Sequence, residues 1–330
     1  MDPHFTETIL RWYAENGRDL PWRRTQDPYA IWLSEIILQQ TRIAQGKAYW
    51  EHFMERFPRV EDLAAAPEDE VMRLWQGLGY YSRARNLHAA AREIAAMGRF
   101  PSTLEGIRAL KGVGDYTAAA IASIAFGIPV AVVDGNVYRV LSRHYGIATP
   151  IGTTAAKKEF TRLADSLISS DEPAAFNQGM MDFGATVCTP HSPACMLCPL
   201  NRSCRAYQDG KTGLLPVKKP PVEVQERHMT YVYVRQGECT ALHRRGPGDI
   251  WQGLWEPWLL ADGESVPDGA RAITKGFKHQ LTHRTLYADF YLWEPAVQPA
   301  LPEGYRWIRE SDLDRYGKPR LFERLLEKIR

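Results

Sequence analysis

The chain has 330 residues, more than a typical single domain, which predicts two folded domains joined by a linker. Hydrophobic residues make up 45% and charged residues 24% of the chain, a globular composition that excludes a disordered or fibrous protein. The net charge is only +2, so a nucleic-acid surface would have to be a local patch. The first residues lack the basic start and apolar run of a secretory signal, so we expect a cytoplasmic protein.

Residues 1–207 are predicted to form an all-α domain, because apolar residues recur at helical spacing and strand-like alternation is scarce. Helix boundaries are expected at Asp27-Pro28 and at residues 100–103, where proline and capping residues occur. The uncharged stretch 116–133 approaches the length of a membrane span. Gly127 interrupts it, and a buried helix, a turn and a second buried segment are predicted instead.

Residues 208–225 contain glycine, proline and lysine and predict an extended, exposed linker. Residues 226–330 are predicted to form a smaller α+β domain. Strands are expected at 229–234 and 286–293, which are rich in β-branched and aromatic residues, and a helix at 320–329.

The first candidate site residue is Glu35, which lies among apolar residues in the segment 32–41. Burial would raise its pKa and make it a proton donor near neutral pH. The alternative is an acid on an exposed helix face. The sequence alone leaves both interpretations open.

The next candidates are Gly112 and Gly114, which allow a sharp turn between two helical stretches. The amide groups of the following helix would suit a DNA phosphate, although a plain helix–helix turn is about equally consistent. Asp134 follows a buried apolar run and precedes a helix predicted to start near Gly135. There it either caps the helix, which the segment alone favours, or faces a developing positive charge as an anion.

Cys188, Cys195, Cys198 and Cys204 are separated by six, two and five residues, a compact grouping that predicts a metal centre. A reducing cytosol disfavours disulfides, so an iron–sulfur cluster and a four-thiolate zinc site are the alternatives. Cys239 lies apart in a predicted strand region and is expected to be a small core residue.

Together these segments resemble the helix-hairpin-helix DNA glycosylases, and within them the MutY-type adenine glycosylases. The resemblance covers nearly the whole chain, including Trp22-Arg23 and residues 77–87 and 176–185. It implies that the four cysteines bind a [4Fe-4S] cluster rather than zinc. Tyr116 stands where endonuclease III-type relatives carry a nucleophilic lysine, which implies an enzyme that forms no Schiff base.

The implied activity is that of a monofunctional glycosylase, which hydrolyses the N-glycosidic bond of adenine opposite 8-oxoguanine. In this interpretation Glu35 protonates the flipped adenine and Asp134 stabilises the cationic sugar. Tyr116 and Asn136 assist through hydrogen bonds. The implied partner is double-stranded DNA of a bacterial nucleoid in the cytoplasm, and the enzyme is expected to act as a monomer away from membranes.

The resemblance also assigns recognition roles. Trp22, Arg23 and Gln178 match the adenine pocket, whereas Gln40 and Tyr80 match residues that probe the 8-oxoguanine site. For Trp22 and Tyr80 the alternative is ordinary core packing.

Residues 226–330 resemble the Nudix-like carboxy-terminal domain of this family. The Arg-Glu-x-x-Glu-Glu helix with which Nudix hydrolases hold divalent metals is missing from the sequence, so we expect a reader of 8-oxoguanine rather than a phosphohydrolase. Relatives place a Phe-Ser-His loop against the oxidised base, and the matching residues here are Leu281, Thr282 and His283.

Two other functions remain open from the sequence. One is a thymine or oxidised-pyrimidine glycosylase of the same fold. The other is an inert damage sensor that binds the mispair without releasing a base, against which the pair of acids Glu35 and Asp134 argues.

Overall fold

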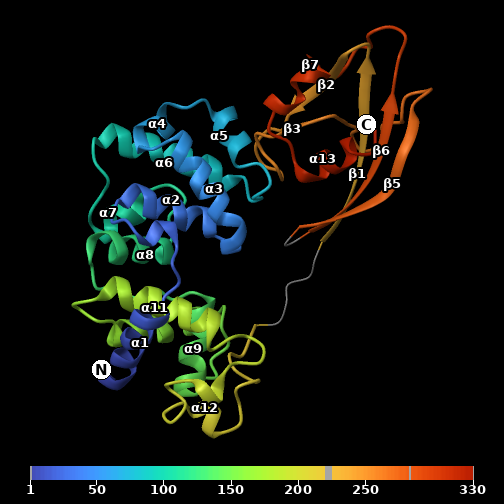
Figure 1. Ribbon diagram of the computed structural model, residues 1–330. Coiled ribbons are helices and arrows are strands. Elements are labelled where there is room, and N and C mark those ends of the chain that lie inside the picture. The colour runs from blue at the N-terminus through green and yellow to red at the C-terminus, as the bar shows by residue number, and fades with distance from the viewer. Residues whose placement is uncertain (1, 220–224, 282–283, 330) are drawn as a thin grey trace. The chain divides into compact units, whose positions relative to one another are not determined.

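The computed structural model describes residues 2–219, 225–281 and 284–329 (Figure 1). The chain forms two compact units, one of Met1–Glu61 with Ala89–Pro220 and one of Asp62–His88 with Pro221–Arg330. The first unit is helical and the second contains a sheet with helices, which confirms the predicted fold class. Within the described ranges no helix is long and apolar enough to cross a membrane.

The helices begin where the sequence provides caps. Asp27 accepts a hydrogen bond from the backbone of Tyr29 at 3.0 Å, and Thr103 accepts one from Gly106 at 3.1 Å. The helices that precede the first strand are α1 (Pro3–Asn16), η1 (Pro21–Arg23), α2 (Pro28–Leu38), α3 (Ile43–Arg56), α4 (Val60–Ala65), α5 (Glu68–Leu74), α6 (Ser82–Met97), α7 (Leu104–Ala109), α8 (Asp115–Phe126), α9 (Gly135–Tyr145), α10 (Thr154–Leu167), α11 (Pro173–Thr186), η2 (Cys195–Leu197) and α12 (Arg205–Gln208).

Helix α11 is central to the first unit, because it contacts α1, α8 and α9. Phe176, Met180 and Phe183 on α11 are buried in a core that they share with residues of α1, α9 and α10. A Cβ atom at Gly184 would lie only 2.6 Å from Cβ of Asn136, so the glycine allows α9 to approach α11 closely. This close approach brings the start of α9 beside one face of α11.

The uncharged stretch 116–133 folds as predicted. Helix α8 ends at Phe126, and Gly127 follows in the left-handed conformation with φ 66°. The next residues have no regular secondary structure, and Val132 is buried with its amide bonded to Asn177 Oδ1 at 3.0 Å. This buried segment leads directly to Asp134.

Part of the predicted linker is packed rather than exposed. Leu215 is buried, its carbonyl accepts a hydrogen bond from Arg143 Nε at 3.0 Å, and the Val217 carbonyl accepts one from the Ile151 amide at 2.8 Å. Burial of the leucine and pairing of these backbone groups hold residues 215–217 on the helical unit.

The second unit contains a seven-stranded mixed sheet in which β1 and β6 run parallel, whereas β5 pairs with β6 and β2 with β1 antiparallel. Residues 229–234 and 286–293 lie in strands, as predicted. Cys239 begins β2 and is only partly buried. The strands and remaining helices are β1 (Gln225–Gln236), β2 (Cys239–Arg244), β3 (Trp255–Glu256), β4 (Trp258–Leu259), β5 (Arg271–Gln280), β6 (Arg284–Trp293), β7 (Tyr305–Arg309), η3 (Glu310–Arg315) and α13 (Arg320–Leu326).

A buried ion pair lies in the second unit. Arg245 Nη1 and Glu256 Oε2 are 2.5 Å apart, and their side chains are only 5% and 4% exposed. The Tyr231 hydroxyl donates to the same carboxylate oxygen at 2.9 Å. The charges are therefore paired and hydrogen-bonded, which a buried ion requires.

We predict that Arg245→Leu lowers the free energy of unfolding of the second unit by about 3 kcal/mol, because Glu256 would remain as a buried, unpaired charge. Urea-induced unfolding measures the change. Removing both charges with Leu substitutions should restore much of the loss. Arg315→Leu is the matched control, since its pair with Asp312 is exposed. Equal losses for Arg245→Leu and the control would contradict the prediction.

Candidate active site

A cavity of about 180 Å³ in the first unit is lined by residues from segments that are far apart in the sequence. Its lining includes seven of the residues singled out from the sequence: Trp22, Arg23, Glu35, Tyr116, Asp134, Asn136 and Gln178. An adjoining cavity is lined by Gln40 together with Glu35, Tyr116 and Asp134. The candidate acids and recognition residues of this unit thus face the same region.

Glu35 lies on α2 and is only 8% exposed, which excludes the alternative of an acid on a solvated helix face. Burial raises its pKa to about 7, against the lowering effects of hydrogen bonding with Tyr116 and of the Arg23 charge. At neutral pH a large fraction of Glu35 therefore carries a proton that it is able to donate.

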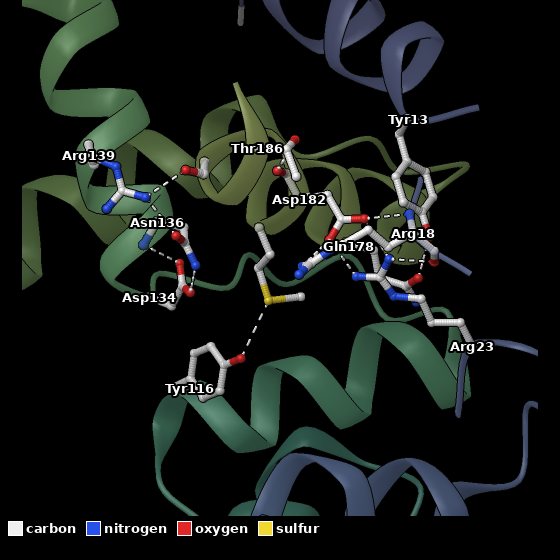
Figure 2. A network of polar contacts seen from close by, with 12 residues as sticks. Tyr13, Arg18, Arg23, Tyr116, Asp134, Asn136, Arg139, Gln178, Asp182 and Thr186 are labelled. Carbon is white, nitrogen blue, oxygen red and sulfur yellow. Dashed lines mark hydrogen bonds and ion pairs between the residues drawn. The ribbon is translucent and has the colours of Figure 1, made fainter. Parts of the chain in front are cut away.

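Tyr116 lies at the start of α8 and faces Glu35. Burial and then the neighbouring carboxylates Glu35 and Asp134 raise the pKa of Tyr116 well above its ordinary value, so its hydroxyl stays protonated. The hydroxyl also contacts Met181 Sδ at 3.4 Å (Figure 2). Tyr116 is thus a neutral hydrogen-bonding group in the cavity.

Asp134 is the N-cap of α9 and also lines the cavity, so the two interpretations of this residue are compatible. Its Oδ1 accepts hydrogen bonds from the amides of Asn136 and Val137, both at 2.8 Å. Its Oδ2 accepts one from Asn136 Nδ2 at 2.7 Å. Three N–H donors at a helix N-terminus provide a suitable environment for a carboxylate anion.

Arg139, for which no role was predicted from the sequence, extends this network. Its Nη2 donates to Asn136 Oδ1 and to the Gly184 carbonyl, both at 2.7 Å (Figure 2). Its Nε donates to the Cys188 carbonyl at 2.6 Å. The spacing from Asn136 to Arg139 places them on one helix face, a signal available in the sequence, but the link to Cys188 depends on tertiary structure.

A second network on the cavity rim centres on Asp182, whose side chain is fully buried (Figure 2). Arg18 donates to it through its backbone amide at 2.9 Å and through its guanidinium. Arg23 donates through Nη1 at 2.6 Å and Nη2 at 2.9 Å. Burial alone would raise the pKa of Asp182, but hydrogen bonds from the two arginines lower it below its ordinary value.

Arg18 and Asp182 were also missed from the sequence. The local signal is that Asp182 is the one charged residue of α11 and lies four positions after Gln178, on the same helix face. Trp22 is buried against Trp50, with ring centroids 5.8 Å apart, and still lines the cavity. Core packing and a place in the pocket are therefore both true of Trp22.

The predicted turn between helices lies between α7 and α8. Gly112 has φ 81°, a conformation that favours glycine. Gly114 is the N-cap of α8, and a Cβ atom there would meet nothing within 4 Å. Packing within the first unit therefore does not require a glycine at 114.

The four cysteines Cys188, Cys195, Cys198 and Cys204 line one small cavity of about 30 Å³. Arg143 Nη1 lies 3.4 Å from the sulfur of Cys188. In the described part of the chain, no three His, Cys, Asp or Glu side chains converge closely enough to hold a single metal ion. Four thiolates are a donor set that iron–sulfur clusters take, so the residues present fit such a cluster.

Another cavity, of about 610 Å³, lies in the second unit and is lined by residues 77–82, 249–252 and 279–281 among others. Tyr80 in its wall is 45% exposed and has φ 46°, so core packing is the wrong interpretation for this residue. Leu281 lines the same cavity. Thr282 and His283, predicted to read the oxidised base, lie outside the described residues.

Two family models match the chain. Residues 33–166 match the HhH-GPD superfamily of base excision DNA repair proteins, and residues 230–328 match the NUDIX domain. An adenine DNA glycosylase of Buchnera aphidicola is 30% identical over an alignment of 343 positions, which covers 99% of this chain and 97% of that protein. The chain belongs to the adenine DNA glycosylase family. The MutY-type resemblance inferred from the sequence is thereby confirmed.

Two mammalian members of the family are more similar but longer. The mouse adenine DNA glycosylase is 42% identical over 67% of this chain, and the human one is 45% identical over 62%. The chain spans only 45% of the mouse and 39% of the human protein.

Solved structures resemble the helical part. A thermostable thymine-DNA glycosylase is 33% identical, with a TM-score of 0.57 over 62% of this chain and 95% of its own. An endonuclease III–DNA complex, 23% identical with a TM-score of 0.53 over 63% of this chain and 95% of its own, shows the same fold. The helix-hairpin-helix glycosylase fold and the Nudix-like domain agree with the predicted fold class.

We predict that Glu35→Gln stabilises the protein at pH 8 but has little effect at pH 4. The unfolded carboxyl ionises near 4.5 and the folded one near 7, so wild-type stability is lost as pH rises from 4.5 through 7. The expected gain at pH 8 is roughly 3 kcal/mol in the free energy of unfolding. Urea-induced unfolding at both pH values measures it, and an equal effect at both would contradict the assignment of a buried, protonated acid.

Proposed function

We propose that the protein is a monofunctional adenine DNA glycosylase, which hydrolyses the N-glycosidic bond of adenine opposite 8-oxoguanine in duplex DNA and so begins base excision repair. The observation that carries the proposal is the placement of Glu35 and Asp134 in one cavity with contrasting environments. Glu35 is buried with a pKa of about 7, whereas Asp134 accepts three N–H donors at a helix N-terminus. Such a pair suits an acid and an electrostatic stabiliser.

In the proposed reaction Glu35 donates its proton to N7 of an adenine that has left the base stack. The bond between C1′ and N9 then breaks, and its electron pair leaves with adenine as a neutral base. Asp134 stabilises the positive charge that develops on the sugar. Water adds to C1′ and loses a proton to the Glu35 carboxylate, which restores the acid. Tyr116 and Asn136 orient these groups by hydrogen bonding.

The proposed base pocket is formed by Trp22, Arg23, Arg18 and Gln178. Trp22 provides an apolar surface, and the arginines and the amide provide hydrogen-bonding groups on the rim of the same cavity. Its volume of about 180 Å³ suits a single base rather than a larger ligand. Gly112 and Gly114 precede the free amides at the start of α8, and we propose that these amides bind a DNA phosphate.

We further propose that the second unit reads the base opposite adenine. Its cavity of about 610 Å³ is bordered by Tyr80, Trp251 and Leu281, which provide apolar and aromatic surfaces for a base. From the family resemblance, Gln40, which lines the adjoining cavity of the first unit, is a further proposed recognition residue, as are Thr282 and His283 outside the described residues. In this proposal the enzyme acts as a monomer on DNA in a bacterial cytoplasm.

The proposed cofactor is a [4Fe-4S] cluster held by Cys188, Cys195, Cys198 and Cys204. When bound, such a cluster would cross-link residues 188–204 through four iron–sulfur bonds. Burial raises the pKa of the Cys198 thiol to about 11. Arg139 and Arg143 hold Cys188 at its carbonyl and sulfur, which fixes one corner of the site.

We predict that the purified protein releases adenine from a duplex with adenine opposite 8-oxoguanine and leaves an alkali-labile site. Glu35→Gln should slow release by about a thousandfold, because general-acid catalysis is lost. The wild-type rate should fall about tenfold per pH unit above 7, as Glu35 loses its proton.

Glu159→Gln, which changes an exposed acid on α10, serves as the control and should leave the rate unchanged. Duplexes with thymine or oxidised pyrimidines test the alternative substrates. Full activity of Glu35→Gln would disprove the assignment of the acid. Binding of the mispair without release of any base would indicate a sensor.

For the cofactor we predict yellow-brown protein with about four iron atoms per chain. Cys198→Ser should lower the iron content and the visible absorbance, whereas Cys239→Ser should change neither, because Cys239 begins β2 away from the four cysteines in sequence. Iron analysis and visible spectroscopy measure both. Colourless protein with stoichiometric zinc would contradict the cluster.

A further inference from the structure

Tyr13 and Gln178 form a contact between α1 and α11 that has no role in the chemistry proposed above. The Tyr13 hydroxyl donates to Gln178 Oε1 at 2.5 Å (Figure 2). Gln178 lines the cavity that contains Glu35, whereas Tyr13 is not among its lining residues. The hydroxyl of Tyr13 is therefore linked to the cavity through the amide of Gln178.

The ring of Tyr13 is held in place from several sides. A Cβ atom at Gly17 would lie 2.8 Å from Tyr13 Cε2, and one at Gly179 would lie 3.0 Å from Tyr13 Cβ. The Arg23 guanidinium lies over the ring, 5.7 Å from its centroid. Gly17, directly after α1, and Gly179 on α11 thus make room for the Tyr13 side chain, and a cation covers its ring. The hydroxyl consequently has a defined position beside Gln178.

The hydrogen-bonding groups around the Tyr13 hydroxyl favour one direction for its proton. Arg18 and Arg23 carry only donors in their guanidinium groups. Asp182 accepts five N–H donors from these two arginines, which fills the acceptor sites of a carboxylate. Among the described groups of this network, Gln178 Oε1 is the acceptor that remains for the hydroxyl.

A glutamine amide exchanges its oxygen and nitrogen when it rotates by half a turn, and so reverses the order of acceptor and donor. We propose that Tyr13 is a positioning residue for base specificity, because its hydroxyl fixes the Gln178 amide in one orientation. The cavity then presents one order of acceptor and donor to a bound base. This inference rests on the proposed adenine glycosylase function and identifies what lets the pocket select a 6-aminopurine over a 6-oxopurine.

Adenine and hypoxanthine provide the test, since they differ at position 6. Adenine has a 6-amino donor and an N1 acceptor, whereas hypoxanthine has a 6-oxo acceptor and an N1–H donor. An amide that is free to rotate would satisfy either base. An amide held in one orientation would reject one of them.

The experiment compares kcat/KM for release of the two bases from duplexes that carry them opposite 8-oxoguanine. Tyr13→Phe should reduce the wild-type preference for adenine over hypoxanthine by about tenfold, the order expected when one neutral hydrogen bond no longer discriminates. Because both substrates are assayed with the same enzyme preparation, the ratio of the two kcat/KM values does not depend on the fraction of folded enzyme.

Gln178→Glu supplies the matched control, because the two oxygens of a carboxylate are equivalent and need no fixed orientation. Tyr13→Phe in the Gln178→Glu background should leave the ratio unchanged. An unaltered ratio in Tyr13→Phe alone, or an equal decrease in both backgrounds, would overturn the proposal. Wild-type protein that releases no adenine would instead refute the proposed function, so the two failures are distinguishable in one assay.

Discussion

The arrangement of the candidate active site depends on one buried charge, Asp182. A carboxylate with no solvent exposure is tolerated in α11 because Arg18 and Arg23 supply five N–H donors to it. These bonds fix the segment after α1 against α11 and place both arginines on the cavity rim. Removing either the carboxylate or the arginines would leave an unpaired charge in the core. The same bonds therefore stabilise both the core and the residues that line the cavity.

Two acids line the cavity, and their surroundings differ. Glu35 lies in the apolar helix α2, where burial shifts its pKa to about 7. Asp134 lies at the start of α9, where backbone amides donate to it. Burial of an acid lowers the free energy of unfolding as pH rises from its ordinary pKa through its raised one, a cost that proteins tolerate at sites adapted for chemistry rather than for stability. The proposed division between proton donor and charge stabiliser follows from these two environments.

Helix α9 connects the acid to the segment that carries the cysteines. Asp134 caps its first turn, Arg139 donates to the Cys188 carbonyl, and Arg143, one turn later, lies beside the Cys188 sulfur. Because one rigid helix carries all three residues, the position of the cysteine segment and that of the carboxylate are geometrically related. The proposed cluster therefore supports a helix that contributes directly to the cavity.

The sequence by itself determined the local features that depend on interactions between neighbouring residues. It predicted helix starts at Asp27 and Thr103, the turn at Gly127, two of the long strands and the compact grouping of cysteines, because caps, glycine conformation and alternation act over a few positions. Neighbouring residues also singled out Glu35 and Asp134 as candidates, and the family resemblance implied their roles. Burial of Glu35, however, is decided by residues distant in the sequence.

Only the tertiary structure showed that Tyr13 supports Gln178 and that Asp182 binds Arg18, because some 165 residues separate the partners and spacing carries no information across that distance. The packing of Leu215, within a segment predicted to be an exposed linker, was decided in the same way by Arg143. Local sequence fixes which elements form, whereas the partners of buried polar groups are chosen when those elements pack.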